Sequence, residues 1–396
     1  MRSIELFAGA AGLGLGLATV GFKHEIVVER DTAACDTMRY NQARGHQLVK
    51  NWDIREADVA NLDLSAVAPG PDLLAGGPPC QDYSLGGKHA GPSGNRNMWP
   101  WTVHAVKTLL PRAFAFENVP GLASQHRAYL DYLVMALTLP EIANPHDHDW
   151  AADAAYLQTR VNERPRQTTG YRVNVVKLTA TDFGTAQNRS RLFIIGIRED
   201  IGRDWVMPTA THSAQQLLAD KWITGAYWQR HGLARPELDD AGLRYLRKHN
   251  QHTSEDLFAT RMDAHRTTRD AVGNLGEPGR DDACPVLDHE AAPRIAKAYK
   301  GHNGSRIDDP SLTLRAGQHG VSGGENMIDY GAAASAGRYR HMTVREAARI
   351  QDFPDDYAFP GTIATGKWSA SLKQLGNAVP LQLAAAVGRS LATALN

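Results

Sequence analysis

A cysteine that directly follows a Gly-Gly-Pro-Pro turn is the most reactive side chain that this sequence offers. The apolar run 73–75 predicts a buried strand, and the turn at 76–79 ends it and carries Cys80 on a stiff loop. Ligands of open parallel sheets bind outside the carboxyl ends of the strands. A thiol placed there attacks electrophiles if a nearby cation or helix N-terminus lowers its pKa, although an isolated cysteine is as often a small buried side chain.

A glutamate and two arginines follow the neighbouring apolar segments. The strand predicted at 113–116 delivers Glu117 to the same edge of the sheet, where partial desolvation should raise its pKa and make it a general acid. Arg189 and Arg191 stand at alternate positions on entering a strand, so they point to one side. Two fixed cations there can hold a carbonyl oxygen and a phosphate. A salt bridge at the strand end is the alternative role for Glu117.

The first seventy residues predict a nucleotide-binding α/β unit. A strand at 3–7 runs into the Gly- and Ala-rich turn 8–16, whose spacing is not the dinucleotide pattern Gly-x-Gly-x-x-Gly. The next strand ends at Glu29, where an acidic side chain can accept hydrogen bonds from ribose hydroxyls. Asp53 follows at an expected third strand end and can take an adenine amino group, although alone it would be a turn residue.

Composition sets limits on the class of protein. The 396 residues are 42% apolar and 22% charged, with 43 basic and 43 acidic side chains, so the formal net charge is zero. Neutrality lowers the expectation of nucleic-acid binding without excluding it, because phosphate binding needs only a local basic surface. Three widely spaced cysteines indicate a reducing compartment. We see no signal peptide and no run of about 18 apolar residues, so we expect a cytoplasmic protein without a membrane.

Changes in composition and hydrophobic periodicity divide the chain into three segments. We expect a catalytic and cofactor-binding domain at 1–200, a DNA-binding target-recognition domain at 201–342, and a C-terminal segment at 343–396 that returns to the first domain. The last segment starts with a capping box at 343–346 and ends in a helix whose apolar residues recur every four positions. The basic loop 85–97 is predicted to be an active-site lid. His146 to Asp149 alternate as metal ligands can, but we expect a solvated loop and no metal site.

The ordered series of motifs resembles the cytosine-5 DNA methyltransferases, of the prokaryotic restriction-modification type, across nearly the whole chain. The series is Phe7-Ala8-Gly9, Glu29, Asp53, Pro78-Pro79-Cys80-Gln81, Glu117-Asn118-Val119, Gln187-x-Arg189-x-Arg191, Arg345-Glu346-Ala347-Ala348-Arg349 and Gly376-Asn377-Ala378-Val379-Pro380. The resemblance implies an α/β fold: a Rossmann-like methyltransferase sheet that binds S-adenosylmethionine, with a smaller, mostly irregular target-recognition domain.

The resemblance also implies the cofactor and its contacts. The cofactor would be S-adenosylmethionine, with its ribose at Glu29 and its adenine at Asp53 and Ile54. The complete set of expected cofactor-binding residues is Phe7, Ala8, Gly9, Ala11, Gly12, Leu13, Glu29, Asp53, Ile54, Pro79, Trp99, Asn377 and Val379.

The implied reaction begins with the addition of the Cys80 thiolate to carbon 6 of cytosine, which turns carbon 5 into a nucleophile. Glu117 would protonate ring nitrogen 3, and Arg191, with Arg189 beside it, would hold the carbonyl oxygen. Because a stacked base cannot reach Cys80, the cytosine must flip out of double-stranded DNA. The expected partners are that DNA and a cognate restriction endonuclease that acts on the same site without stable contact; the enzyme itself is expected to be a monomer.

The sequence departs from the family pattern at two positions, and three alternative functions remain open. Ala11 replaces a commoner glycine, and Asp82 stands where a small or apolar residue is usual; we expect Asp82→Ala to keep activity. The alternatives are methylation of RNA, a catalytically silent DNA-binding relative, and a nicotinamide-dependent oxidoreductase. The last would leave the loops at Cys80 and Glu117 without a purpose.

Overall fold

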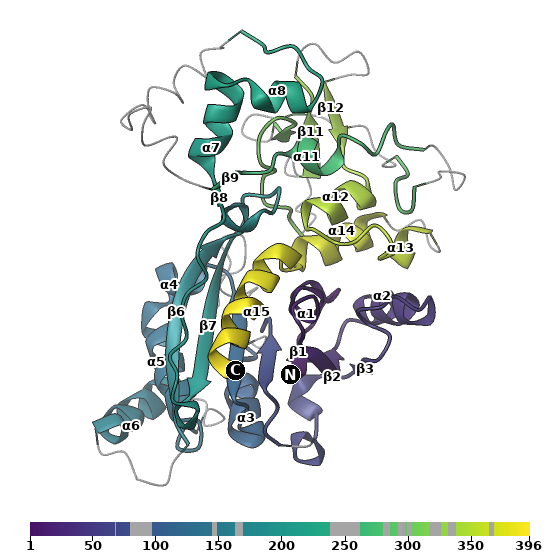
Figure 1. Ribbon diagram of the computed structural model, residues 1–396. Coiled ribbons are helices and arrows are strands. Elements are labelled where there is room, and N and C mark those ends of the chain that lie inside the picture. Colours follow the sequence, from purple (N-terminus) through teal and green to yellow (C-terminus); the bar gives the residue numbers. More distant parts are fainter. Residues whose placement is uncertain are drawn as a thin grey trace.

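A seven-stranded sheet forms the body of the molecule (Figure 1). The computed structural model describes residues 1–67, 69–79, 97–144, 149–162, 169–237, 262–279, 286–291, 296, 298, 303–316, 326–331, 338–363 and 368–396. The strand order is β3-β2-β1-β4-β5-β7-β6. The strands are β1 (Arg2–Leu6), β2 (Lys23–Glu29), β3 (Asp53–Glu56), β4 (Leu73–Gly76), β5 (Ala113–Asn118), β6 (Tyr171–Thr179) and β7 (Ser190–Arg198).

The direction of the strands creates the edge on which the site is built. β3, β2, β1, β4 and β5 pair in parallel, whereas β7 runs antiparallel to both β5 and β6. The carboxyl ends of the parallel strands therefore meet at one edge, where the loops after β1, β2, β4 and β5 come together. The entry into β7 lies at the same edge, because Leu192 pairs with Asn118 at the end of β5.

Helices cover both faces of the sheet. Ile4, Leu74 and Phe114 share one buried cluster with helices α3 (Trp99–Leu109), α5 (Arg127–Thr138) and their neighbours α4 (Gly121–Gln125) and α6 (Trp150–Asn162). The residues that alternate with them pack on α1 (Gly12–Ala18) and α15 (Leu381–Leu395) on the opposite face. Helix α2 (Thr32–Ala43) packs beside α1. This three-layer arrangement confirms the predicted Rossmann-like α/β fold.

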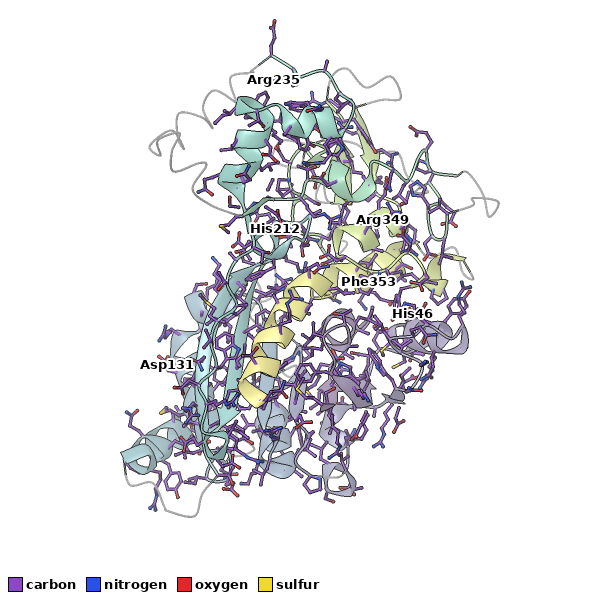
Figure 2. All side chains as sticks on the ribbon, viewed as in Figure 1. His46, Asp131, His212, Arg235, Arg349 and Phe353 are labelled. Carbon is purple, nitrogen blue, oxygen red and sulfur yellow. The ribbon has the colours of Figure 1, made fainter. Side chains whose placement is uncertain are left out.

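A second region of short elements, here called the upper region, lies above the sheet in Figure 1. It holds α7 (Ala214–Leu218), α8 (Ala226–Arg230), α11 (Thr268–Val272), β8 (His212–Ser213), β9 (Asp263–Ala264), β10 (Ser305–Arg306), β11 (Met327–Asp329) and β12 (Tyr339–His341). His212, labelled in Figure 2, lies at its junction with the sheet. Leu217, Tyr227 and Trp228 form a small core of their own there, so this region matches the mostly irregular texture expected from the sequence.

The C-terminal elements connect the two regions. They are α12 (Val344–Ile350), α13 (Pro360–Ile363), α14 (Trp368–Asn377) and α15. The expected capping box is present: the Thr343 side chain accepts from the Glu346 amide, and the Glu346 side chain accepts from the Thr343 amide. The predicted apolar face of α15 is buried at Leu383, Val387 and Leu391.

One helical stretch is long and apolar enough to meet a simple test for a membrane span. Among the described helices, Trp368–Leu395 passes that test by length and composition, but 72% of its 18-residue window is buried inside the structure. The apolar side chains of α15 pack on α1 and the sheet, so the core accounts for them.

Candidate active site

A cavity of about 500 Å³ opens at the carboxyl edge of the parallel strands. It is lined by residues that follow β1, β2, β3 and β4, by Glu117 of β5, and by the end of α14. Of the residues expected to bind the cofactor, the structure brings Phe7, Ala8, Gly9, Leu13, Glu29, Pro79, Asn377 and Val379 to this cavity.

Glu117 and Arg191 form an ion pair at one end of the cavity. The Arg191 Nε atom lies 2.6 Å from Glu117 Oε1, and the two side chains are only 11% and 12% exposed. Glu117 pairs with Phe193 across the strands, so Arg191, two residues before Phe193, is its diagonal neighbour on the same face. Burial raises the pKa of Glu117, although the positive charges of Arg191 and Arg189 partly offset it. This agrees with the direction expected from the sequence.

The Gly-Gly-Pro-Pro turn lies directly against this ion pair. A Cβ atom on Gly77 would lie 3.4 Å from Glu117 Oε2, and the Asn118 side-chain amide donates to the Pro78 carbonyl at 3.2 Å. Pro79 lines the cavity together with Glu117. Cys80 is the next residue of the chain; it lies outside the described residues, as do Asp82, most of the predicted lid (85–96) and His146 to His148.

The Glu29 carboxylate connects the turn after β1 to the turn after β2 through hydrogen bonds. The Gly9 amide donates to Glu29 Oε2 at 2.7 Å, and the Arg30 and Asp31 amides each donate to Oε1 at 2.7 Å. Gly9 adopts a positive φ of 55°, which glycine tolerates without strain. Glu29 thus sits at the rim of the cavity with its carboxylate fixed by backbone donors.

Asp53 and Ile54 are not brought to the cavity, which corrects the expected adenine contacts. β3 starts at Asp53 instead of ending there, because Asp53 pairs with Ile26 and the strand continues to Glu56. Asp53 is exposed and bonded to Arg55 at 2.8 Å. The residues that follow the true end of β3 line the cavity in their place: Ala57, Asp58 and Val59.

Trp99, Ala11 and Gly12 also lie outside the cavity lining. Trp99 is fully buried at the start of α3, with its ring 6.1 Å from that of Phe116, and Met98 lines the cavity instead. Gly12 packs on the turn before α15, where a Cβ would come 2.4 Å from the Val379 carbonyl oxygen. Ala11 is buried with a φ of 70°, which explains why glycine would suit this position.

Arg189 has a different place from the one expected of a catalytic side chain. It is buried, and its guanidinium donates to the carbonyls of Leu314 at 3.1 Å and Gly376 at 2.7 Å. It therefore joins the segment 311–316 of the upper region to the end of α14. Its charge still influences Glu117, but its hydrogen bonds are those of a positioning residue.

The cavity is acidic. Its acidic lining residues, Glu5, Glu29, Asp31, Asp58 and Glu117, outnumber the basic ones, Arg30 and Lys373. An excess of carboxylates favours a cationic ligand and disfavours the pyrophosphate of a dinucleotide. Sequence reasoning missed Glu5, Asp58, Lys373 and Gln374 as lining residues. Among the described residues no group of His, Cys, Asp and Glu side chains could hold a metal ion.

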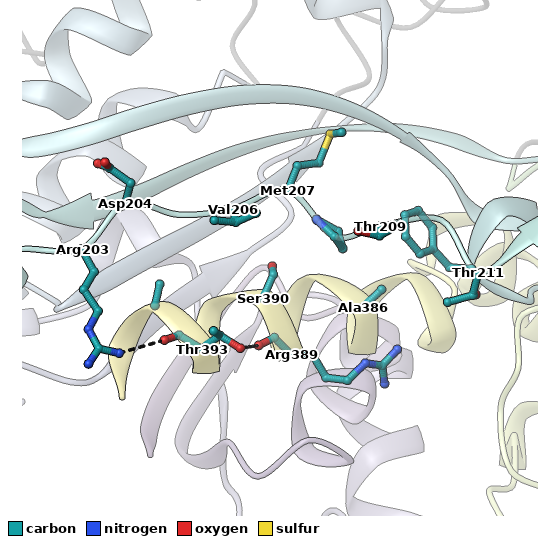
Figure 3. A pocket seen from close by; sticks show the side chains of 13 residues that line it. Arg203, Asp204, Val206, Met207, Thr209, Thr211, Ala386, Arg389, Ser390 and Thr393 are labelled. Carbon is teal, nitrogen blue, oxygen red and sulfur yellow. Dashed lines mark hydrogen bonds between the residues drawn. The ribbon is translucent and has the colours of Figure 1, made fainter.

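A second cavity of about 600 Å³ lies between α15 and the segment 203–211 (Figure 3). The Arg203 guanidinium bonds to the Thr393 carbonyl at one end of it, and Val206 and Met207 stand exposed at its rim. No residue predicted to act in catalysis or cofactor binding lines this cavity.

Curated relatives align over almost the full chain. The type II methyltransferase M.PspPI of Psychrobacter is 28% identical over 408 residues, covering 99% of this chain and 79% of its own. The type II methyltransferase M.Eco47II of Escherichia coli is 28% identical over 397 residues, covering 98% of this chain and 78% of its own.

Solved structures share the fold. The Dnmt2 methyltransferase of S. pombe superposes with a TM-score of 0.56 at 15% identity, over 100% of this chain and 99% of its own. The methyltransferase EhMeth of Entamoeba histolytica gives 0.55 at 13% identity, with the same coverage. The family model described as C-5 cytosine-specific DNA methylase matches residues 1–142 and 164–393. This match spans both sides of the cavity and the upper region, and the chain belongs to the C-5 cytosine-specific DNA methylases.

Proposed function

We propose that the edge formed by Cys80, Glu117 and Arg191 methylates carbon 5 of a flipped-out cytosine within a specific double-stranded DNA sequence. The chain is a DNA cytosine-5 methyltransferase by family, and the methyl donor of this family is S-adenosylmethionine. The observation that supports the residue roles is the buried Glu117–Arg191 pair against the turn that leads into Cys80.

The cavity fits S-adenosylmethionine. It has a suitable volume, and its carboxylates complement a ligand that carries a sulfonium and an ammonium group. Glu29 would take the ribose, and Asp58 with Val59 the adenine, in place of the Asp53 and Ile54 first expected. Phe7 and the turn after it, with Asn377 and Val379, would complete the pocket. When bound, S-adenosylmethionine supplies an electrophilic methyl group.

The protein must make carbon 5 of cytosine nucleophilic. The Cys80 thiolate adds to carbon 6, and the electron pair of the 5,6 double bond moves toward carbon 5 and the ring. Glu117 in its neutral form donates its proton to ring nitrogen 3, for which its raised pKa suits it. After methyl transfer, which leaves S-adenosylhomocysteine, a base removes the proton at carbon 5, the double bond re-forms and the thiolate leaves, while ring nitrogen 3 returns its proton to Glu117.

Arg191 has two tasks in this scheme. Its guanidinium keeps Glu117 in place through the 2.6 Å contact, and its remaining donors can hold the carbonyl oxygen of the base. Because charge builds up on the ring when the thiolate adds, a cation fixed beside it stabilises the adduct.

Double-stranded DNA would lie between the sheet edge and the upper region. The base must leave the stack to reach Cys80, at a cost of a few kcal/mol. The segment 201–342 would read the sequence in the major groove. We further propose that the enzyme acts as a monomer in the cytoplasm, and that a cognate restriction endonuclease cuts the same site without stable contact.

Trapping on DNA that carries 5-fluorocytosine tests the proposal. Fluorine at carbon 5 cannot leave as a cation, so the covalent adduct with the thiolate should persist after methyl transfer. The wild-type protein with S-adenosylmethionine should form a complex that survives denaturing electrophoresis, and Cys80→Ser should not. A Cys80→Ser variant that still forms the complex would refute the assigned nucleophile.

A further inference from the structure

Asp352 occupies a backbone position at which glycine is the usual residue. It directly follows Gln351, the C-cap of α12, and has a φ of 64°. Its amide donates to the Arg349 carbonyl at 3.0 Å, and the amide of Phe353 donates to the Ala348 carbonyl at 2.9 Å. This pair of bonds is a Schellman motif, whose left-handed residue is most often glycine because a Cβ there has a conformational cost. An aspartate at this position indicates a task for its side chain.

The Asp352 carboxylate lies where three parts of the chain meet. The side chain is only 5% exposed, and the Thr185 hydroxyl donates to Oδ2 at 2.6 Å. Arg266, between β9 and α11 of the upper region, donates from Nη1 to Oδ1 at 3.4 Å. The backbone of Gln382, in the first turn of α15, forms a further hydrogen bond with this carboxylate. One side chain therefore contacts the turn before β7, the upper region and the start of α15.

The contact with Arg266 is an ion pair at neutral pH. Burial raises the pKa of Asp352 to about 6, while the Thr185 hydroxyl, the Arg266 charge and the Gln382 backbone oppose this rise. The carboxylate is therefore mostly ionised at pH 7. The Arg266 side chain is 39% exposed, so water screens the pair in part. A contact of this kind can fix an orientation and still open reversibly.

The turn 182–185 carries further contacts between the sheet and the upper region. Arg266 Nη1 also donates to the Gly184 carbonyl at 3.3 Å. His265 Nε2 lies 3.1 Å from Asp182 Oδ1. Phe353, labelled in Figure 2, shows where the residue after Asp352 lies between the two regions. Arg266 thus lies between a backbone carbonyl of the sheet region and the carboxylate that follows α12.

We propose that Asp352 is a positioning residue, which holds the upper region in one orientation above the active-site edge so that DNA meets two surfaces already aligned. The inference rests on the proposed binding of DNA between these two parts. The turn 182–185 leads toward β7, whose Arg191 pairs with Glu117. Helix α15 follows Val379, which lines the cofactor cavity. The carboxylate therefore ties the upper region to the elements that carry the catalytic and cofactor-binding side chains.

Loss of the carboxylate should weaken DNA binding without slowing the chemistry. Without it, the upper region should adopt several orientations, of which only one fits DNA. The apparent affinity then falls with the fraction of molecules in the aligned orientation, whereas saturating DNA restores that orientation.

Steady-state kinetics of Asp352→Gly tests this expectation. Glycine suits the left-handed backbone, so the end of α12 should be kept. Losing one charge-assisted contact shifts an equilibrium by about ten- to a hundredfold. The KM for DNA should rise about three- to tenfold, because only part of this shift depletes the aligned fraction, and kcat should stay within about twofold. The affinity for S-adenosylmethionine should stay within about twofold, because Asp352 does not line the cavity.

A double-mutant cycle tests whether Asp352 acts through Arg266. Arg266→Met should raise the KM for DNA to a similar extent, and the double variant should raise it little further. If Arg266 contacts DNA on its own, the two rises multiply, and this result would overturn the inference. Asp72→Ala is the matched control, because Asp72 pairs with Arg112 at 2.8 Å just before β4 and β5, at the opposite edge of the sheet. It should change the KM for DNA by less than about twofold.

Hydrogen exchange in the protein without DNA gives a second readout. The Thr211 amide donates to the Asp182 carbonyl at 2.9 Å, so the peptide that holds Thr211 reports on the junction. It should exchange faster in Asp352→Gly, while peptides of β5 keep their wild-type rates. An unchanged junction, equal acceleration along the whole chain, or a lower kcat with an unchanged KM would overturn the inference. A wild-type protein that does not methylate DNA would instead contradict the proposed function, and the exchange rates would still test the role of Asp352.

Discussion

Arg191 Nε and Glu117 Oε1 lie 2.6 Å apart where β7 begins and β5 ends, and Glu117 lines the cavity together with Gly77 and Pro79. This pair sets the protonation of Glu117 by two opposed effects. Burial favours the neutral acid and the guanidinium favours the carboxylate, with burial the larger. A glutamic acid balanced in this way can give a proton to a base ring and take it back.

Replacing Arg191 should change the pH profile as well as the rate. Arg191→Met removes a cation that lowers the pKa of Glu117, so this pKa should rise further. Because the neutral acid is the active form, the high-pH limb of the activity profile should move to higher pH. The maximal rate should fall about 10²- to 10³-fold through loss of the fixed cation. Methylation assays across a range of pH measure both the shift and the maximal rate. A high-pH limb that stays at its wild-type position would contradict the electrostatic coupling of Arg191 to Glu117.

Arg189 should prove to be a positioning residue. Arg189→Lys replaces the planar guanidinium by a single ammonium group, which cannot donate to both the Leu314 and the Gly376 carbonyls. One or both carbonyls would then be buried without a hydrogen-bond partner. We expect a loss of about 2 kcal/mol in the free energy of unfolding and a higher KM for DNA, because Leu314 belongs to the upper region.

Denaturant unfolding and steady-state kinetics measure these two effects. Arg389→Lys on the exposed side of α15 is the matched control, with a change within about 0.5 kcal/mol. A variant at Arg189 that folds as stably as wild type but has lost all methylation would indicate a direct catalytic role.

The edge residues that follow strongly apolar strands were predictable from the sequence. Glu117, Pro79 and Glu29 come after runs that can only be buried strands, and the structure has them at the cavity. The end of β3 was harder to predict, because the sequence Asp-Ile-Arg-Glu contains no apolar run. The sequence analysis therefore placed the end of this strand too early. A usable signal was Asp58, which precedes a short helical turn and caps it by accepting from the Ala60 amide.

Other parts of the site depend on the tertiary fold. Lys373 and Gln374 reach the cavity from α14, where the Lys373 ammonium lies 3.3 Å from Asp31 at the start of α2. No local pattern predicts a contact across more than three hundred residues. The alternate spacing predicted that Arg189 and Arg191 point to the same side of the strand. Only the packing of the segment 311–316 on the loop 186–189 shows that Arg189 bonds to Leu314 while Arg191 bonds to Glu117.

Asp58 and Asp53 form a matched pair for testing the revised adenine site. Asp58 lines the cavity and bonds to Arg30 at 3.1 Å, whereas Asp53 is exposed outside it. Asp58→Ala should weaken S-adenosylmethionine binding about tenfold, the value of one good hydrogen bond. Asp53→Ala should leave the affinity within about twofold. Calorimetry of both variants decides between the two positions, and the reverse order would restore the first expectation.

Glu5 should also appear in the pH dependence of stability. Its pKa is raised from 4.5 to about 8 in the fold, so the unfolded chain gives up this proton at lower pH than the folded protein does. The contribution is fully present below pH 4.5 and is lost as pH rises toward about 8. The unfolding free energy of wild type should therefore fall relative to that of Glu5→Gln as pH rises through this window. A difference that stays constant would mean that Glu5 is ionised in the folded protein.

Methylation by Cys80 is the central claim, and bisulfite sequencing tests it most directly. DNA would be taken from a methylation-free host that expresses the wild-type chain or Cys80→Ala. The account predicts cytosines protected from conversion within one short sequence motif in the first sample and none in the second. Protection that persists in Cys80→Ala, or no protection by a wild-type protein that binds both DNA and S-adenosylmethionine, would contradict it.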